Sequence, residues 1–331
     1  MKQRQPGGSE GLDQRQIALV DLGNALRAAG YTFVTPTPET HRRVNAREAA
    51  AEARNLRDIF GWSRPFRPDT LPAPLLALCE TAQVLRPGPR PDTLLSRVRF
   101  STLEAPTGRF LFVHSAYPTT DSGAVFFGPD SYRYAALLGR TVWKARRLVD
   151  VGCGTGVGGL VLAARAEEVV LADVSPDALR LAAVNVALAG RDASTVTLTV
   201  SDVLAGVEGD VDVVVSNPPY LAGPDAASPG SPRLYRDGGG PLGIDLAARI
   251  AVEALQRLGA GRGGQLVLYT GVPIVDGRNL LQDRLERSLR EAASAWTWEE
   301  LDPDVFGEEL ERPAYRDVER LAVVALTATV G

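Results

Sequence analysis

The chain is poor in the residues that most often hold metal ions. Its 331 residues include two cysteines, Cys79 and Cys153, and two histidines, His41 and His114. These residues form no Cys-x-x-Cys pair and no other recognisable ligand spacing, so the sequence predicts no metal site. So few cysteines fit a reducing compartment, and we expect a cytoplasmic protein.

Long apolar runs and an excess of positive charge are also missing. No apolar run approaches the ~20 residues needed to span a bilayer, so we expect no membrane partner. The first fifteen residues are polar and glycine-rich, and they do not resemble a secretory signal. The formal net charge is −4 and Lys2 and Lys144 are the only lysines, so no global basic field attracts nucleic acid.

The amino-terminal third has the pattern of a small helical unit followed by a hairpin. Apolar periodicity and composition predict helices at residues 12–29, 39–60 and 75–84. Alternating apolar residues at 95–103 and 109–114 predict two antiparallel strands.

The rest of the chain alternates strand and helix patterns, which is typical of an α/β fold. A hydrophobic content of 45% over 331 residues is enough for one full α/β domain and a smaller one. We expect the last two strands, near residues 295–301 and 321–329, to pair antiparallel. The predicted division is a mainly helical accessory or substrate-recognition domain at residues 1–94, a β-hairpin connector at 95–128 and the α/β domain at 129–331.

Asn217-Pro218-Pro219-Tyr220 is the most informative segment. It follows an apolar run, residues 211–216, that predicts a buried parallel strand. Two successive prolines cannot continue a strand ladder, so they form a stiff turn at its end. That edge is where open α/β sheets bind ligands. An amide held beside an aromatic ring suits the binding of a flat, nitrogen-bearing group.

A glycine-rich turn lies upstream, between a predicted strand that ends near Asp150 and a predicted helix. Its glycines are Gly152, Gly154 and Gly156. Glycines permit positive φ and let backbone N–H groups approach a ligand closely. Gly154-x-Gly156-x-x-Gly159 also fits the dinucleotide fingerprint, although that match alone is a weak signal.

These two segments carry a family resemblance. The run from Asp150 to Gly156, Asp-Val-Gly-Cys-Gly-Thr-Gly, resembles the first motif of class I S-adenosylmethionine-dependent methyltransferases. Asn217 to Tyr220 resembles the signature of those members that methylate planar nitrogens, either glutamine amides or the exocyclic amines of adenine and cytosine. The resemblance implies a doubly wound, seven-stranded, mostly parallel sheet and S-adenosylmethionine as cofactor.

Two further acids follow predicted strands where this family needs them. Asp173 is placed to accept hydrogen bonds from the ribose hydroxyls of a nucleoside. Asp202, next to Val203, is placed to accept from the adenine amino group. A single acid of this kind is often a helix N-cap instead, and Asp173 precedes Ser175-Pro176. We therefore expect a cofactor site built from Asp150, Gly152, Gly154, Gly156, Asp173, Asp202 and Val203.

The catalytic residues implied by the resemblance are Asn217, Pro218, Pro219 and Tyr220. An amide or aryl-amine nitrogen is a poor nucleophile because its lone pair is delocalised. The hypothesis is that the Asn217 side-chain oxygen and the Pro218 carbonyl accept the target N–H bonds and orient the lone pair. Tyr220 would stack on the flat target group.

Two other segments are similar to HemK-type methyltransferases, which methylate the glutamine of translation release factors. They are the pre-motif segment 126–131, with Asp130-Ser131 before a helix, and the glycine loop 237–245, expected to act as a lid or substrate-side wall. The Arg-Pro-Glu-Thr-like string of the bacterial branch is missing. The missing string counts against a release factor, whereas the two similar segments imply a protein glutamine amide as the acceptor and a release factor as the partner.

Other acceptors stay open on the sequence alone. An adenine amine of ribosomal RNA or DNA fits Asn217 to Tyr220 equally well, and residues 133–147 carry a cluster of cations that suits phosphate. A small-molecule acceptor and a non-catalytic scaffold are further alternatives. The acidic segment 302–313 is interpreted as a surface loop or as a cover over the active site. Nothing in the sequence predicts the oligomeric state.

Overall fold

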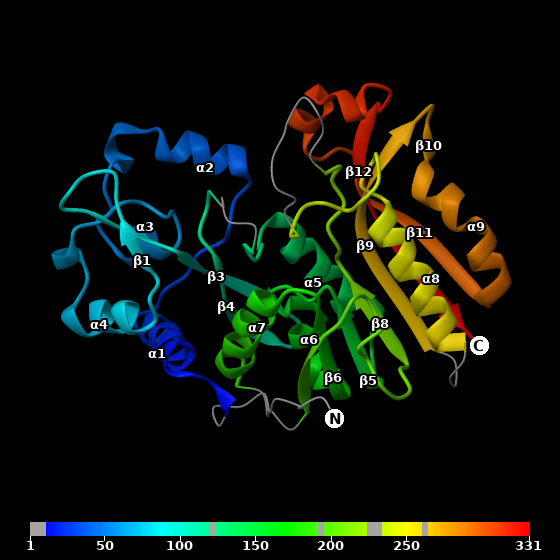
Figure 1. Ribbon diagram of the computed structural model, residues 1–331, viewed down its shortest axis with the longest axis horizontal. Helices are drawn as coiled ribbons and strands as arrows, with labels where there is room; N and C mark the ends of the chain where they lie inside the picture. The colour runs from blue at the N-terminus through cyan, green and yellow to red at the C-terminus, as the bar shows by residue number, and fades with distance from the viewer. Residues whose placement is uncertain (1–10, 119–122, 191–194, 224–233, 260–263) are drawn as a thin grey trace.

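The computed structural model describes residues 11–118, 123–190, 195–223, 234–259 and 264–331. Its amino-terminal helices lie at one end of the molecule, and the last strands and helices lie at the opposite end (Figure 1). Within these described ranges, no helix is long and apolar enough to cross a membrane.

The amino-terminal region is helical with a short two-stranded sheet. Its elements are α1 (Gln14–Ala28), α2 (Pro38–Asn45), α3 (Leu56–Phe60), α4 (Ala73–Thr81), β1 (Leu85–Pro87) and β2 (Leu94–Ser96), with 3-10 turns at Glu48–Ala50 and Pro68–Thr70. The single helix predicted over residues 39–60 is wrong. Asn55 caps a new helix there by accepting from the Asp58 N–H, and Asp58 accepts in turn from the Arg54 N–H. These side-chain bonds compete with a continuous helix.

The predicted hairpin is confirmed as β3 (Val98–Ala105) and β4 (Gly108–Ser115), which pair antiparallel. It joins the two regions firmly. Asn185 of α7 (Pro176–Leu188) exchanges hydrogen bonds with the Val113 backbone, at 2.8 and 3.0 Å. Val184 and Leu188 of the same helix are buried in one hydrophobic cluster with residues of α1 and β3. The amino-terminal region therefore shares a core with the rest of the chain.

The large sheet follows the predicted fold class, and its order is β11-β12-β9-β8-β5-β6-β7. The strands β5 to β9 run parallel, and β12 and β11 pair antiparallel at one edge, as predicted. The bounds are β5 (Ala145–Val151), β6 (Ala166–Asp173), β7 (Val196–Val200), β8 (Val213–Ser216), β9 (Gly264–Val275), β11 (Ala295–Asp302) and β12 (Arg320–Val330); the short β10 (Arg278–Asn279) pairs with β9.

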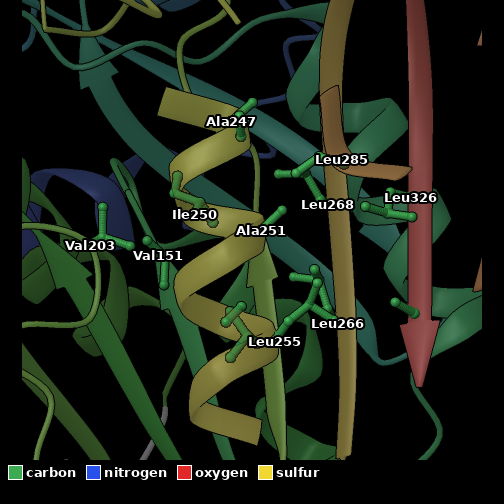
Figure 2. Packing of buried hydrophobic residues seen from close by; sticks show 14 of the residues in the cluster. Val151, Val203, Ala247, Ile250, Ala251, Leu255, Leu266, Leu268, Leu285 and Leu326 are labelled. Carbon is green, nitrogen blue, oxygen red and sulfur yellow. The ribbon is translucent and has the colours of Figure 1, made fainter. Parts of the chain in front are cut away.

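Helices cover both faces of this sheet. One face packs against α8 (Asp245–Gly259) and α9 (Leu280–Ala292), and the other against α5 (Pro129–Thr141), α6 (Val157–Leu162) and α7. Figure 2 shows Ala251 and Leu255 of α8 directed toward Leu266 and Leu268 of β9. Each fully buried leucine of this kind contributes about 1.5–3 kcal/mol, so the two layers hold the strand ends rigidly.

Candidate active site

Two neighbouring parallel strands bring the glycine turn and the Asn-Pro-Pro-Tyr segment together. Val151, the last residue of β5, pairs with Ser216, the last residue of β8. The Ser216 hydroxyl also donates to the Val151 carbonyl at 2.7 Å. Gly152 and Asn217 are the next residues on the two strands, so both lie at the carboxyl edge of the sheet, side by side.

The glycine turn has the left-handed backbone that its sequence requires. Gly152, Gly154 and Gly156 have φ of 64°, 52° and 82°. These values are strained for residues with a Cβ. The turn is tied to β6, because the Gly154 N–H donates to the Asp173 carboxylate at 2.9 Å. The other Asp173 oxygen accepts from the Ser175 N–H at 2.8 Å.

Asp173 is not the N-cap of α7. Ser175 holds that position, and its hydroxyl accepts from the Ala178 N–H at 3.3 Å. The Asp173 carboxylate lies instead at the edge of the glycine-turn cavity. Burial raises its pKa, while the backbone N–H groups of Ser175 and Gly154 oppose that rise.

Asp150 lies beneath the turn. Its carboxylate accepts from the Gly159 N–H at 2.9 Å and from the Tyr134 hydroxyl at 3.2 Å. Burial raises its pKa to about 7, although both hydrogen bonds act in the opposite direction. Asp150 therefore joins the start of α6 to α5, in addition to lining the cavity.

One cavity, here called the glycine-turn cavity, gathers most of the predicted site. Its lining includes Asp150, Gly152, Gly154, Asp173, Asp202, Val203, Asn217, Pro218 and Pro219. Gly156 and Tyr220 do not line it; Gly156 is the N-cap of α6. The cavity also includes Val125, Phe126 and Tyr235, which sequence reasoning did not single out as site residues.

Asp202 is exposed to solvent at the edge of this cavity. Its carboxylate pairs with Arg249 of α8 at 2.8 Å, and 63% of its side chain is exposed. Val203 beside it is buried and has a positive φ of 51°. Asp202 and Val203 follow β7 and bring one polar and one apolar side chain to the cavity.

Tyr220 is held in place by a buried carboxylate. Its hydroxyl donates to Asp130 at 2.6 Å, and the Tyr269 hydroxyl donates to the other Asp130 oxygen at 2.8 Å. Asp130 is 4% exposed. It is the second residue of α5, whose N-cap is Gly128. The tyrosine ring also lies against Gly271 of β9, where a Cβ would come within 2.2 Å of it.

The glycine loop 237–245 braces the backbone of the same corner. The Gly238 N–H donates to the Leu221 carbonyl at 2.8 Å. A Cβ at Gly238 would lie 2.7 Å from the Pro219 carbonyl oxygen, and one at Gly243 would lie 2.4 Å from the Tyr220 carbonyl oxygen. This loop thus supports the turn from behind, and its Asp237 also lines the glycine-turn cavity.

A second cavity, here called the Arg99 cavity, adjoins the glycine-turn cavity at the Asn-Pro-Pro-Tyr turn. Its volume is about 450 Å³, and Asn217, Pro218 and Pro219 line it as well as the glycine-turn cavity. Tyr220 lines the Arg99 cavity but not the glycine-turn cavity. The rest of the Arg99 cavity is lined by the amino-terminal region, the hairpin and the acidic segment. These residues include Thr35, Pro36, Pro38, His41, Arg99, His114, Tyr117, Phe306, Glu308 and Glu309.

The acidic segment 302–313 is therefore more than a surface loop. It forms a short 3-10 turn at Gly307–Glu311, and Glu309 is 8% exposed. The Glu309 carboxylate pairs with Arg236 at 2.5 Å and with Arg312 at 3.0 Å. These ion pairs hold the segment against the rim of the Arg99 cavity, which Phe306, Glu308 and Glu309 help to line.

Comparison with known proteins agrees with this geometry. Residues 133–234 match the family model of the methyltransferase small domain. The release factor glutamine methyltransferase of Deinococcus radiodurans is 37% identical over 171 residues, which cover 49% of this chain and 55% of that protein. The same-named protein of Cereibacter sphaeroides is 37% identical over 132 residues, covering 38% and 46%.

An RNA-modifying enzyme is also similar. The ribosomal RNA small subunit methyltransferase C of Cronobacter sakazakii is 32% identical over 110 residues, which cover 33% of this chain and 31% of that protein. The chain thus spans about half the length of the glutamine methyltransferases and about a third of the RNA enzyme. Residues 133–234 therefore match a methyltransferase small domain, and the chain is similar to class I S-adenosylmethionine-dependent methyltransferases of the HemK type.

Proposed function

We propose that this chain transfers a methyl group from S-adenosylmethionine to the side-chain amide of a glutamine in a protein, of the release-factor type. One observation carries the proposal: Asn217, Pro218 and Pro219 line both cavities. A flat group that enters from the Arg99 cavity meets the Asn217 side chain at the border of the glycine-turn cavity. The names of two similar proteins support glutamine as the acceptor.

The residues of the glycine-turn cavity suit the cofactor. Asp173 offers carboxylate oxygens to the ribose hydroxyls, and Asp202 offers one to the adenine amino group. A Cβ at Gly152 would meet no atom within 4 Å, so the turn leaves open space beside its backbone. When bound, S-adenosylmethionine supplies an electrophilic methyl group on a positively charged sulfur.

Asn217 supplies the orientation that a poor nucleophile needs. Among the described residues, no hydrogen bond engages its side chain, which is only partly buried. In the proposal, the Asn217 Oδ1 and the Pro218 carbonyl accept the two N–H bonds of the substrate amide. This holds the nitrogen lone pair toward the glycine-turn cavity and stabilises positive charge as it develops on nitrogen.

An RNA acceptor is the second candidate, because a similar protein is an RNA methyltransferase. Three of the five cations at residues 133–147 are already paired with carboxylates, which weakens the support that this cluster gives. Arg133 pairs with Asp302 at 2.7 Å, Arg140 with Glu299 at 2.9 Å and Arg147 with Glu168 at 3.2 Å. Cations already paired with carboxylates release few counterions on binding phosphate.

The two candidates are separated by incubating the full chain with radiolabelled S-adenosylmethionine and a fractionated cell lysate. We expect label in protein, stable to nuclease, and a labelled peptide that contains N-methylglutamine. Label that disappears on ribonuclease treatment, together with retention on heparin and a steep loss of binding with salt, would replace this proposal with the RNA one.

Asp130 gives a prediction about the position of Tyr220. Asp130→Asn removes the charged acceptor of the Tyr220 hydroxyl, a bond worth about 1.5–3 kcal/mol, so kcat should fall about tenfold or more. The dissociation constant of S-adenosylmethionine should not change, because Asp130 does not line the glycine-turn cavity. The matched control is Tyr269→Phe, which removes the neighbouring bond to Asp130 and leaves that of Tyr220. Normal kcat in Asp130→Asn would contradict a positioning role.

A further inference from the structure

Arg99 is an unusually buried cation. It belongs to β3, it is 3% exposed, and it lines the Arg99 cavity. Its Nε donates to the Gly61 carbonyl at 2.6 Å, and its guanidinium carbon lies 5.3 Å from the centre of the Phe33 ring. These contacts hold the guanidinium in one orientation. Its buried Nη2, however, has no hydrogen-bond partner among the described residues.

The charge of Arg99 is also not balanced by a neighbouring carboxylate. Within the described ranges, no Asp or Glu lies within ion-pair distance of it, whereas the partly buried Arg64 pairs with Asp58 at 2.5 Å. Burial lowers the pKa of Arg99 to about 10, so the side chain is still charged at neutral pH. A buried charge without a partner is costly, and buried cations are normally paired.

The two histidines of the same cavity do not share this charge. Burial lowers the pKa of His41 to about 4, and burial together with Arg99 lowers that of His114 well below its usual value. His41 Nε2 lies 2.8 Å from the Trp62 carbonyl, and His114 Nε2 lies 2.8 Å from the Ser101 hydroxyl. Both rings are therefore neutral at pH 7. Among the described residues that line the Arg99 cavity, Arg99 is the cation without a carboxylate partner.

We propose that Arg99 binds a carboxylate of the methyl acceptor, so that the substrate glutamine lies beside an anionic group. This inference rests on the proposed function and adds the chemical class of the substrate. The guanidinium fork presents parallel N–H donors that match a carboxylate, and Nη2 supplies a donor that the protein leaves unused. The carboxylate is either the carboxyl terminus of the substrate chain or an acidic side chain next to the glutamine.

The charge of the cavity favours a carboxylate over a phosphate. The lining also contains Asp130, Glu308 and Glu309, against which only Arg99 and Arg236 are positive. Arg236 is paired with Glu309. A single negative charge is balanced by Arg99, whereas a doubly charged phosphate or a nucleic-acid backbone would be repelled by the remaining acids.

The test uses two matched pairs of small probes with the full chain, in the presence of S-adenosylhomocysteine. N-acetylglutamine is compared with N-acetylglutaminamide, and the amidated dipeptide N-acetyl-Gln-Glu with N-acetyl-Gln-Gln. Dissociation constants are measured by nuclear magnetic resonance titration. We expect at least one carboxylate probe to bind about tenfold more tightly than its neutral partner, in line with a charge-assisted hydrogen bond. The pair that shows the preference identifies the source of the carboxylate.

Arg99→Met should abolish this preference, and Arg99→Lys, which keeps the charge but not the fork, should reduce it. The matched control is Arg64→Met, which removes a partly buried, carboxylate-paired arginine outside the cavity and should keep the preference. Melting temperature and S-adenosylmethionine affinity report folding. If Arg99→Met does not fold, the wild-type comparison and Arg99→Lys decide the question.

Equal binding within both probe pairs by the wild-type chain overturns the inference, and so does an unchanged preference in Arg99→Met or in Arg99→Lys. These outcomes differ from a failure of the proposed function. Label that enters protein glutamine without any carboxylate preference refutes the role of Arg99 alone. An Arg99-dependent preference in a chain that labels only RNA refutes glutamine methylation.

Discussion

Asn217→Ala should abolish methyl transfer and leave the affinity for S-adenosylmethionine unchanged. The side chain lies at the border between the two cavities, and no other amide or carboxylate occupies an equivalent position on the Asn217–Pro219 turn. Loss of one preorganised group of this kind typically lowers kcat by about 100- to 1,000-fold. Cofactor affinity is set by other residues of the glycine-turn cavity, so a calorimetric titration should give the wild-type dissociation constant.

Two further variants make this result specific. Asn217→Asp keeps an oxygen acceptor in place but introduces a charge, so it should retain part of the activity. Asn279→Ala removes an asparagine that caps α9, where its side chain accepts from the Leu281 and Gln282 N–H groups. That change costs about 1 kcal/mol of stability and should not alter kcat. Near-normal kcat in Asn217→Ala, with the labelled product confirmed, would show that another group orients the acceptor.

The sequence was sufficient to predict the part of the site that depends on one continuous strand and its turn. The glycine turn and the Asn-Pro-Pro-Tyr turn follow directly from β5 and β8, because parallel strands bring their carboxyl ends to one edge. The final antiparallel pair was expected from the resemblance to a seven-stranded fold, and β11 and β12 pair in that way.

The Arg99 cavity was not predictable in this way. Arg99 alternates with the apolar Val98 and Phe100 on β3, and such alternation indicates a solvent-facing side chain. It is buried because the amino-terminal helices cover that face of the hairpin, which only the tertiary structure shows. Asp130 is a similar case. Its place before a helix suggests a cap, while its contacts with Tyr220 and Tyr269 join residues about 90 and 139 positions away.

Asp173→Ala should have the opposite effect to Asn217→Ala and weaken cofactor binding. In the proposal, its carboxylate accepts from both ribose hydroxyls, and two such bonds of about 1.5 kcal/mol each correspond to roughly 100-fold in the dissociation constant. The carboxylate also anchors the Gly154 and Ser175 N–H groups, so its loss loosens the turn itself. At saturating S-adenosylmethionine, kcat should recover to a large part of the wild-type value.

The matched control for this variant is Asp177→Ala, because Asp177 lies in the first turn of α7, is largely exposed and does not line the glycine-turn cavity. Its loss should leave the affinity for S-adenosylmethionine, measured by calorimetry, unchanged. Asp173→Asn has the same shape without the charge, so its affinity should lie between those of Asp173→Ala and the wild type.

The pH dependence of cofactor binding provides an independent check. Because burial raises the pKa of Asp173, cofactor affinity should be complete above that pKa and should be lost, as pH falls, sooner than an ordinary aspartate would allow. A dissociation constant that is the same in the wild type and in Asp173→Ala would mean that the ribose is held by other residues.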